Sequence, residues 1–169
     1  MSTAAEAALQ KPLAKGGSDA DCARPVSWAA AVLAALVSGG LLATCFYPLN
    51  WHWMAWVALV PWLMVLPRVS PVQAWLYGTP LGLCFYRLCL DWGFGIHRLT
   101  AGVFILVLAV WMGFAFRVAR LLMHWFSPAA MLCAVPLAFV GQEVIRCEAL
   151  PRLRFPFLAF GYSQSHMPW

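Results

Sequence analysis

Charged residues are scarce in this 169-residue chain, where they make up 10% of the sequence, against about 25% in soluble globular domains. Among the charged residues, the acidic ones are fewer, with six Asp and Glu beside eleven Lys and Arg. Hydrophobic residues make up 63% of the sequence. This composition excludes an ordinary soluble domain. The basic residues are scattered over tails and short loops, so they form no stripe of the kind that binds nucleic acid. We therefore expect a polytopic membrane protein with no nucleic-acid partner.

Several enzyme and metal-site motifs are missing as well. The sequence contains no G-x-S-x-G, no H-E-x-x-H, no P-loop and no G-x-G-x-x-G. Its six cysteines form no C-x-x-C pair and have no His at metal-ligand spacing. We expect neither a disulfide framework nor a metal or cofactor site, and we interpret the cysteines as small buried hydrophobic residues.

Long apolar segments account for most of the sequence. They follow a tail, residues 1–25, which is rich in Ala, Gly and Ser and is predicted to be disordered and cytoplasmic. A membrane-spanning helix needs about 20 apolar residues. The predicted fold is an all-α, polytopic membrane helical bundle over residues 26–169, with about five transmembrane helices and an interfacial segment at 150–169. We expect the spans at about 26–47, 53–67, 72–96, 100–120 and 129–145.

The distribution of basic residues predicts the orientation. With the N-terminus inside, the inner segments hold six Lys or Arg and the outer segments hold four, apart from Arg87 in the membrane. Cytoplasmic loops carry an excess of basic residues. This modest bias predicts a multi-pass protein whose N-terminus is cytoplasmic.

Arg87 and Asp91 are the only charges expected at membrane depth. Their i, i+4 spacing places them on one helix face, where they can pair. Two interpretations stay open: a functional intramembrane pair, or an Arg87 that snorkels with Asp91 near the outer interface. In the same segment, Gly78 and Gly82 form a small-xxx-small pair, which predicts close packing against another helix of the chain.

A second polar group follows the fifth apolar segment. Glu143 and Arg146 stand one turn apart at its end, and a stretch rich in aromatic residues then leads to Tyr162, Ser163 and Gln164. Pro156 and Gly161 within that stretch exclude one uninterrupted helix, so we expect it at a membrane interface or folded back on the bundle. Ser163 lies near His166 in the sequence, but this adjacency does not make a catalytic dyad.

These residues resemble the membrane part of bacterial apolipoprotein N-acyltransferase. The family has a Glu-x-Leu-Arg-Gly helix end followed by Phe-Pro-Trp-Leu-x-x-Gly-Tyr-Ser-Gln, and residues 143–147 and 155–164 are similar to both. This sequence departs from the pattern at Ile145, Cys147 and Phe157. Residues 46–63 and 78–92 are similar to earlier parts of the family, so the resemblance covers about residues 26–165.

The resemblance implies a multi-pass enzyme of the bacterial inner membrane. Its family transfers an acyl chain from phospholipid to the N-terminal cysteine of lipoproteins, using a Glu-Lys-Cys triad in a nitrilase-like domain. No residue here matches that triad. The resemblance therefore implies a chain that is truncated before the catalytic domain or encoded as a split gene, inactive alone, with that domain as a separate partner. Glu143, Arg146, Tyr162, Ser163 and Gln164 would line or brace the opening for the two lipid substrates.

Two alternatives remain open at this point. One is a stand-alone, non-catalytic membrane scaffold or lipid-binding protein that descends from the same fold. The other is a small transporter that uses Arg87 and Asp91 as an intramembrane relay.

Overall fold

A computed structural model describes residues 26–46, 48–126 and 128–146 of the chain. All of the regular secondary structure in these ranges is helical, which confirms the all-α prediction. The predicted tail at 1–25 and the predicted interfacial segment at 150–169 lie outside the described residues.

The first helix, α2 (Trp28–Ala43), turns a face of small residues towards the bundle. Ser27 begins it, because its hydroxyl accepts the backbone N–H of Ala30 at 3.2 Å. The buried positions recur at helical spacing: Ala31, Ala35, Ser38, Gly39 and Leu42. A Cβ added at Gly39 would lie 2.5 Å from the carbonyl oxygen of Leu81, so α2 lies directly against the backbone of the helix that contains Leu81.

Residues 52–68 contain three short helices, where the sequence predicts a span at about 53–67 that Pro61 interrupts. These are η1 (His52–Trp56), α3 (Val60–Val65) and η2 (Leu66–Arg68). Pro61 lies in the first turn of α3, where its missing N–H removes no helical hydrogen bond. The next residue, Trp62, donates its backbone N–H to the Ser38 hydroxyl at 3.0 Å. A side chain of α2 thereby caps the start of α3.

Helix α4 (Pro71–Cys89) lies between α2 and α6. It starts at a capping box, in which the Ser70 hydroxyl accepts the Gln73 N–H at 3.2 Å and the Gln73 side chain accepts the Ser70 N–H at 2.9 Å. A turn then separates it from the short α5 (Gly93–Ile96). The span expected at 72–96 is therefore divided into two helices.

The longest helix is α6 (Arg98–Trp125), whose 28 residues extend over about 42 Å. Within the described residues it is the one helix long and apolar enough to cross a membrane, over Arg98–Met123 with a mean hydropathy of 2.3. Only 39% of its apolar window is buried in the structure, so its remaining apolar surface fits a lipid environment. The expected total of about five transmembrane helices stays a prediction.

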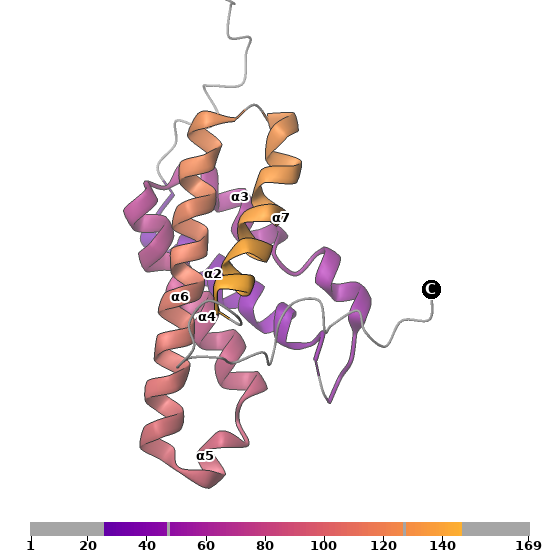
Figure 1. Cartoon of the computed structure of the whole chain (residues 1–169), viewed down its shortest axis with the longest axis vertical. Helices are drawn as coiled ribbons and strands as arrows, with labels where there is room; N and C mark the ends of the chain where they lie inside the picture. The colour runs from indigo at the N-terminus through magenta and orange to yellow at the C-terminus, as the bar shows by residue number, and fades with distance from the viewer. Residues whose placement is uncertain (1–25, 47, 127, 147–169) are drawn as a thin grey trace, which may run out of the picture.

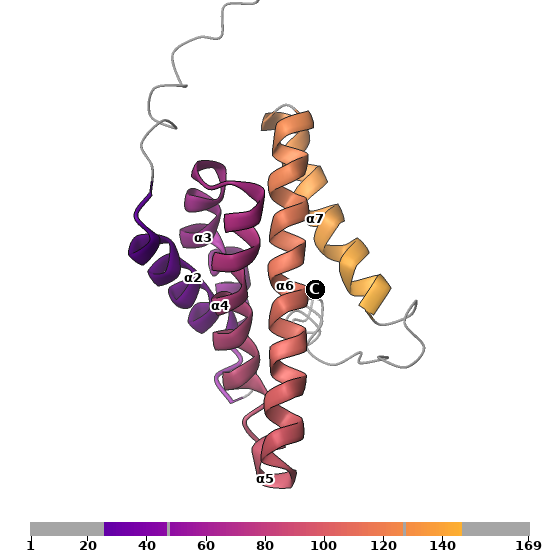
Figure 2. The ribbon, with the colours of Figure 1, turned by 90° about the vertical axis from the view of Figure 1, so that its left-hand side faces the viewer.

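Helix α7 (Pro128–Val144) packs on α6 and contains Pro136, as expected from the sequence. Figure 1 shows α7 starting beside the end of α6 and running back along it. In Figure 2 the helices α2, α4, α6 and α7 follow one another in a row, with α5 at the far end of α6. The bundle is thus a layer of helices with α4 and α6 at its centre.

Close contact between α4 and α6 depends on glycine. A Cβ added at Gly82 would lie 2.8 Å from the Cα of Ala109, and one at Gly78 would lie 2.8 Å from the Phe116 ring. Gly113 on α6 makes a similar close contact with α4, because a Cβ there would lie 2.6 Å from the carbonyl oxygen of Trp75. The close packing predicted for Gly78 and Gly82 is therefore confirmed, as a contact within the chain.

Candidate functional site

Buried polar side chains gather at the end of α7. Among the described residues, the buried polar or charged side chains are Ser38, Gln142 and Arg146, with Arg146 only 4% exposed. The Arg146 guanidinium lies 3.7 Å from a carboxylate oxygen of Glu143, one turn earlier. Two of the three buried polar residues thus belong to one short stretch, and a carboxylate stands beside them.

A row of aromatic rings holds this end of α7 against the bundle. Phe139, one turn before Glu143, meets the Phe116 ring of α6 edge to face at a centroid distance of 5.1 Å. Phe116 in turn meets the Trp62 ring of α3 at 5.6 Å. Such pairs contribute about 0.5–1.5 kcal/mol each beyond the burial of their area. The rings connect three helices and so fix where Glu143 and Arg146 lie.

The local backbone and electrostatics set this end apart from an ordinary helix end. The chain widens into a π-helical turn at Ile145 and Arg146, a geometry that is frequent at functional sites. The buried Oε1 atom of Gln142 accepts no hydrogen bond from any part of the chain that the structure describes. Since buried polar atoms are nearly always paired, this end of α7 is suited to receive another polar group.

Arg87 and Asp91 form an ion pair at a different place, at the end of α4. Their side chains are 51% and 71% exposed, and the Arg87 guanidinium also lies 4.4 Å from the centre of the Phe94 ring. An exposed i, i+4 pair of this kind contributes about 0.3–0.5 kcal/mol. The structure thus places the two predicted polar groups on different helices, one group exposed and the other buried.

The remaining predicted site residues, Tyr162, Ser163 and Gln164, lie outside the described residues. No group of three His, Cys, Asp or Glu side chains suited to a metal ion occurs in residues 26–46, 48–126 and 128–146. The described thiols at Cys45, Cys84, Cys89 and Cys133 are free.

Sequence reasoning missed two features that the structure shows. Gln142 is one, although an amide next to Glu143 in an apolar segment was a signal for it. The other is an apolar groove between Trp75 of α4 and the outer face of α6. The spacing of Val107, Val110 and Phe114 follows one helix face, but the contribution of Trp75 depends on how the helices pack.

Comparison with protein families gives the wider context of this site. Residues 38–169 match the family model described as the apolipoprotein N-acyltransferase N-terminal domain. The chain belongs to this family. No curated protein and no solved structure matched it. The match to the N-acyltransferase domain includes both Glu143 and Arg146 and the Tyr162–Gln164 stretch, and the exposed apolar surface of α6 agrees with a membrane-associated domain.

Proposed function

We propose that this chain is the membrane part of an apolipoprotein N-acyltransferase, which transfers an acyl chain from a phospholipid to the N-terminal cysteine of a lipoprotein. The observation that carries the proposal is the family match over residues 38–169, which contains α3, α4, α6 and α7 entirely. The chain is proposed to be a multi-pass protein of the bacterial inner membrane with a cytoplasmic N-terminus.

The helices and the acyl-transfer chemistry are assigned to different parts of the enzyme. No residue of this sequence matches the Glu-Lys-Cys triad that the family resemblance places in a nitrilase-like domain. Acyl transfer therefore needs residues outside these 169, and the helices described here anchor the catalytic domain and shape the path of its two lipid substrates. The exposed apolar surface of α6 supports contact with lipid.

The polar end of α7 is proposed to position the segment that leads towards the catalytic domain. Glu143 and Arg146 are held by the ring contacts of Phe139, so a charge pair is fixed beside an otherwise apolar layer. Tyr162, Ser163 and Gln164 follow Arg146 within twenty residues in the sequence. Their hydroxyl and amide groups are the proposed lining of the substrate opening.

Complementation tests whether the helices and the nitrilase-like domain have these separate roles. The chain is expressed alone, and then with a separately encoded nitrilase-like domain, in cells depleted of their own N-acyltransferase. Mass spectrometry of a lipoprotein then reports its N-terminal acyl chain. We expect N-acylation only when both parts are present. N-acylation by the chain alone would show that the nucleophile lies in this sequence.

The same experiment separates the alternatives. A stand-alone membrane scaffold gives no N-acylation with or without the added domain. The transporter hypothesis rests on Arg87 and Asp91, whose side chains pair with each other at the end of α4. In a transport assay, charge-removing substitutions at these two positions are expected to have no effect.

A further inference from the structure

One side of α6 carries a groove with apolar walls. Trp75 of α4 forms one wall, and the other residues come from α6: Leu106, Val107, Val110, Trp111 and Phe114. Its volume is about 490 Å³, within the range of about 300–1,000 Å³ that is common for small-molecule sites. The α6 residues extend over about 12 Å of the helix axis. An elongated apolar groove of this size suits a hydrocarbon chain.

The Trp75 wall is held in place by contacts with α6. Its indole N–H donates to the carbonyl oxygen of Val110 at 3.2 Å. Its backbone also approaches α6 closely, because a Cβ at Gly113 would lie 2.6 Å from the Trp75 carbonyl oxygen. The groove is therefore a built feature of the α4–α6 contact.

A cation stands at one end of the groove. Arg117 follows Phe114 by three residues, which places it on the same face of α6, and its guanidinium lies 5.9 Å from the centre of the Trp75 ring. In the described part of the chain no carboxylate pairs with Arg117.

Two more arginines add positive charge at this end. Arg120, one turn further along α6, donates its Nε–H to the carbonyl oxygen of Val69 at 2.8 Å, next to the exposed Arg68. This hydrogen bond brings Arg120 to Val69, the residue that follows Arg68 at the end of η2. The end of the groove at Arg117 is therefore positively charged.

We propose that this groove and Arg117 bind one anionic phospholipid. An acyl chain lies along the groove, and the phosphate accepts hydrogen bonds from the Arg117 guanidinium, whose planar donors match phosphate oxygens. Arg68 and Arg120 favour a headgroup with net negative charge over a zwitterionic one, because basic clusters next to a membrane attract anionic lipids. Trp75 is suited to the interface between the acyl chain and the headgroup.

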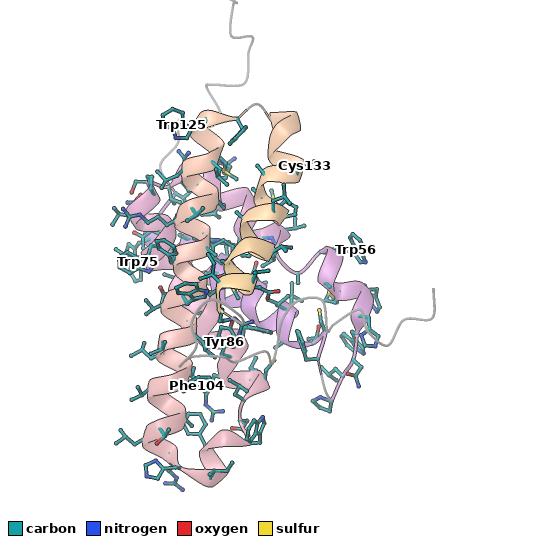
Figure 3. The ribbon with its side chains drawn as sticks, viewed as in Figure 1. Trp56, Trp75, Tyr86, Phe104, Trp125 and Cys133 are labelled. Atoms are coloured by element: carbon teal, nitrogen blue, oxygen red, sulfur yellow. The ribbon has the colours of Figure 1, made fainter. Side chains whose placement is uncertain are left out.

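This lipid site is separate from the polar end of α7. Figure 3 shows Trp75 on the side of α6 away from α7. None of the six lining residues carries a nucleophile, so these residues hold the lipid and supply no cleavage chemistry of their own. The site consequently goes beyond the proposed acyl transfer and does not depend on it.

Native mass spectrometry of the delipidated full chain tests the site. The protein is titrated separately with phosphatidylglycerol, phosphatidylethanolamine and inorganic phosphate. We expect one tightly retained phosphatidylglycerol, weaker retention of phosphatidylethanolamine, and no retained phosphate, because the groove supplies part of the affinity.

Two substitutions and their matched controls locate the lipid. Arg117→Gln is expected to weaken phosphatidylglycerol binding roughly tenfold, since it removes a charge-assisted contact with phosphate. Val107→Trp fills the groove and is expected to weaken the binding of both lipids. The controls are Arg98→Gln, at the other end of α6, and Val103→Trp, one turn outside the groove. Both controls are expected to bind as the unsubstituted chain does.

The result that overturns the proposal is equal binding by each variant and its control, which would mean ordinary lipid at an unspecific surface. Equal retention of the two lipids would also contradict the anionic site. Arg117→Lys guards against a folding artefact, because it keeps the charge but loses the planar donors. We expect its binding to fall between that of the unsubstituted chain and that of Arg117→Gln, and binding equal to Arg117→Gln would contradict a role for the charge.

Discussion

The two ion pairs within residues 26–46, 48–126 and 128–146 have the same charges and nearly the same spacing, but their surroundings differ. Arg87 and Asp91 lie at the end of α4 with side chains 51% and 71% exposed, whereas Arg146 and Glu143 lie at the end of α7 with side chains 5% and 16% exposed. Breaking an exposed ion pair costs little free energy, because solvent can hydrate both charges. Breaking a buried pair costs more, because the remaining charge has been removed from solvent. Burial therefore indicates which pair is built into the structure.

The largest expected effect comes from breaking the buried pair. Glu143→Gln removes the carboxylate that lies 3.7 Å from the buried Arg146 guanidinium, and breaking a buried pair in this way should cost about 3–5 kcal/mol of unfolding free energy. Unfolding in mixed detergent micelles measures this cost. As a control, the double substitution Glu143→Gln with Arg146→Met removes both charges and should restore most of the stability. A single substitution that costs less than about 1 kcal/mol would show that this pair is as solvated as the exposed one.

The next effect concerns what keeps the α7 pair buried. Phe139→Ala removes the ring that packs on Phe116 and should cost about 3 kcal/mol, in line with other buried Phe to Ala changes. Leu137→Ala is the matched control, because that side chain is 69% exposed on the same helix. The same unfolding measurement applies to both. Equal losses of unfolding free energy for the two variants would mean that the contact between Phe139 and Phe116 does not hold the end of α7 against α6.

A much smaller effect is expected at the exposed pair. Asp91→Asn removes the carboxylate that pairs with Arg87 and should change the unfolding free energy by no more than about 0.5 kcal/mol. Thermal unfolding in detergent detects a larger change if one occurs. A loss of unfolding free energy similar to that of Glu143→Gln would contradict the proposed difference between the two pairs.

The smallest expected effect is the different salt dependence of the coupling energies of the two ion pairs. Between about 0.1 and 1 M salt the Debye length falls from about 10 to about 3 Å, so exposed charges are screened and buried ones much less. Double-mutant cycles at the two salt concentrations should show the Arg87–Asp91 coupling falling towards zero and the Glu143–Arg146 coupling nearly unchanged. Equal salt sensitivity would contradict the different burial of the two pairs.

Local sequence signals predicted much of the helical arrangement. The apolar length of 100–120 and 129–145 indicated α6 and α7, and Gly78 with Gly82 indicated a close helix contact. Residues 53–67 were harder to predict, because the division into short helices involves a contact between Trp62 and Ser38, 24 positions earlier.

The candidate site also has one property that the sequence predicts and another that it does not. The spacing of Glu143 and Arg146 is visible in the sequence, since residues one turn apart on a helix are neighbours. Their burial is not, because it comes from the contact of Phe139 with Phe116 on another helix. The groove beside Trp75 likewise arises from a contact with Val110, 35 positions away, which no local pattern contains.

The most direct test of the account compares the two pairs in function. Cells depleted of their own N-acyltransferase express this chain together with a separately encoded nitrilase-like domain, and mass spectrometry measures lipoprotein N-acylation. One variant neutralises the buried pair through Glu143→Gln and Arg146→Met, and the other neutralises the exposed pair through Arg87→Met and Asp91→Asn, each checked for folding by thermal unfolding. We predict loss of N-acylation for the first variant and retention for the second. Retention in both would contradict a functional role for the polar end of α7.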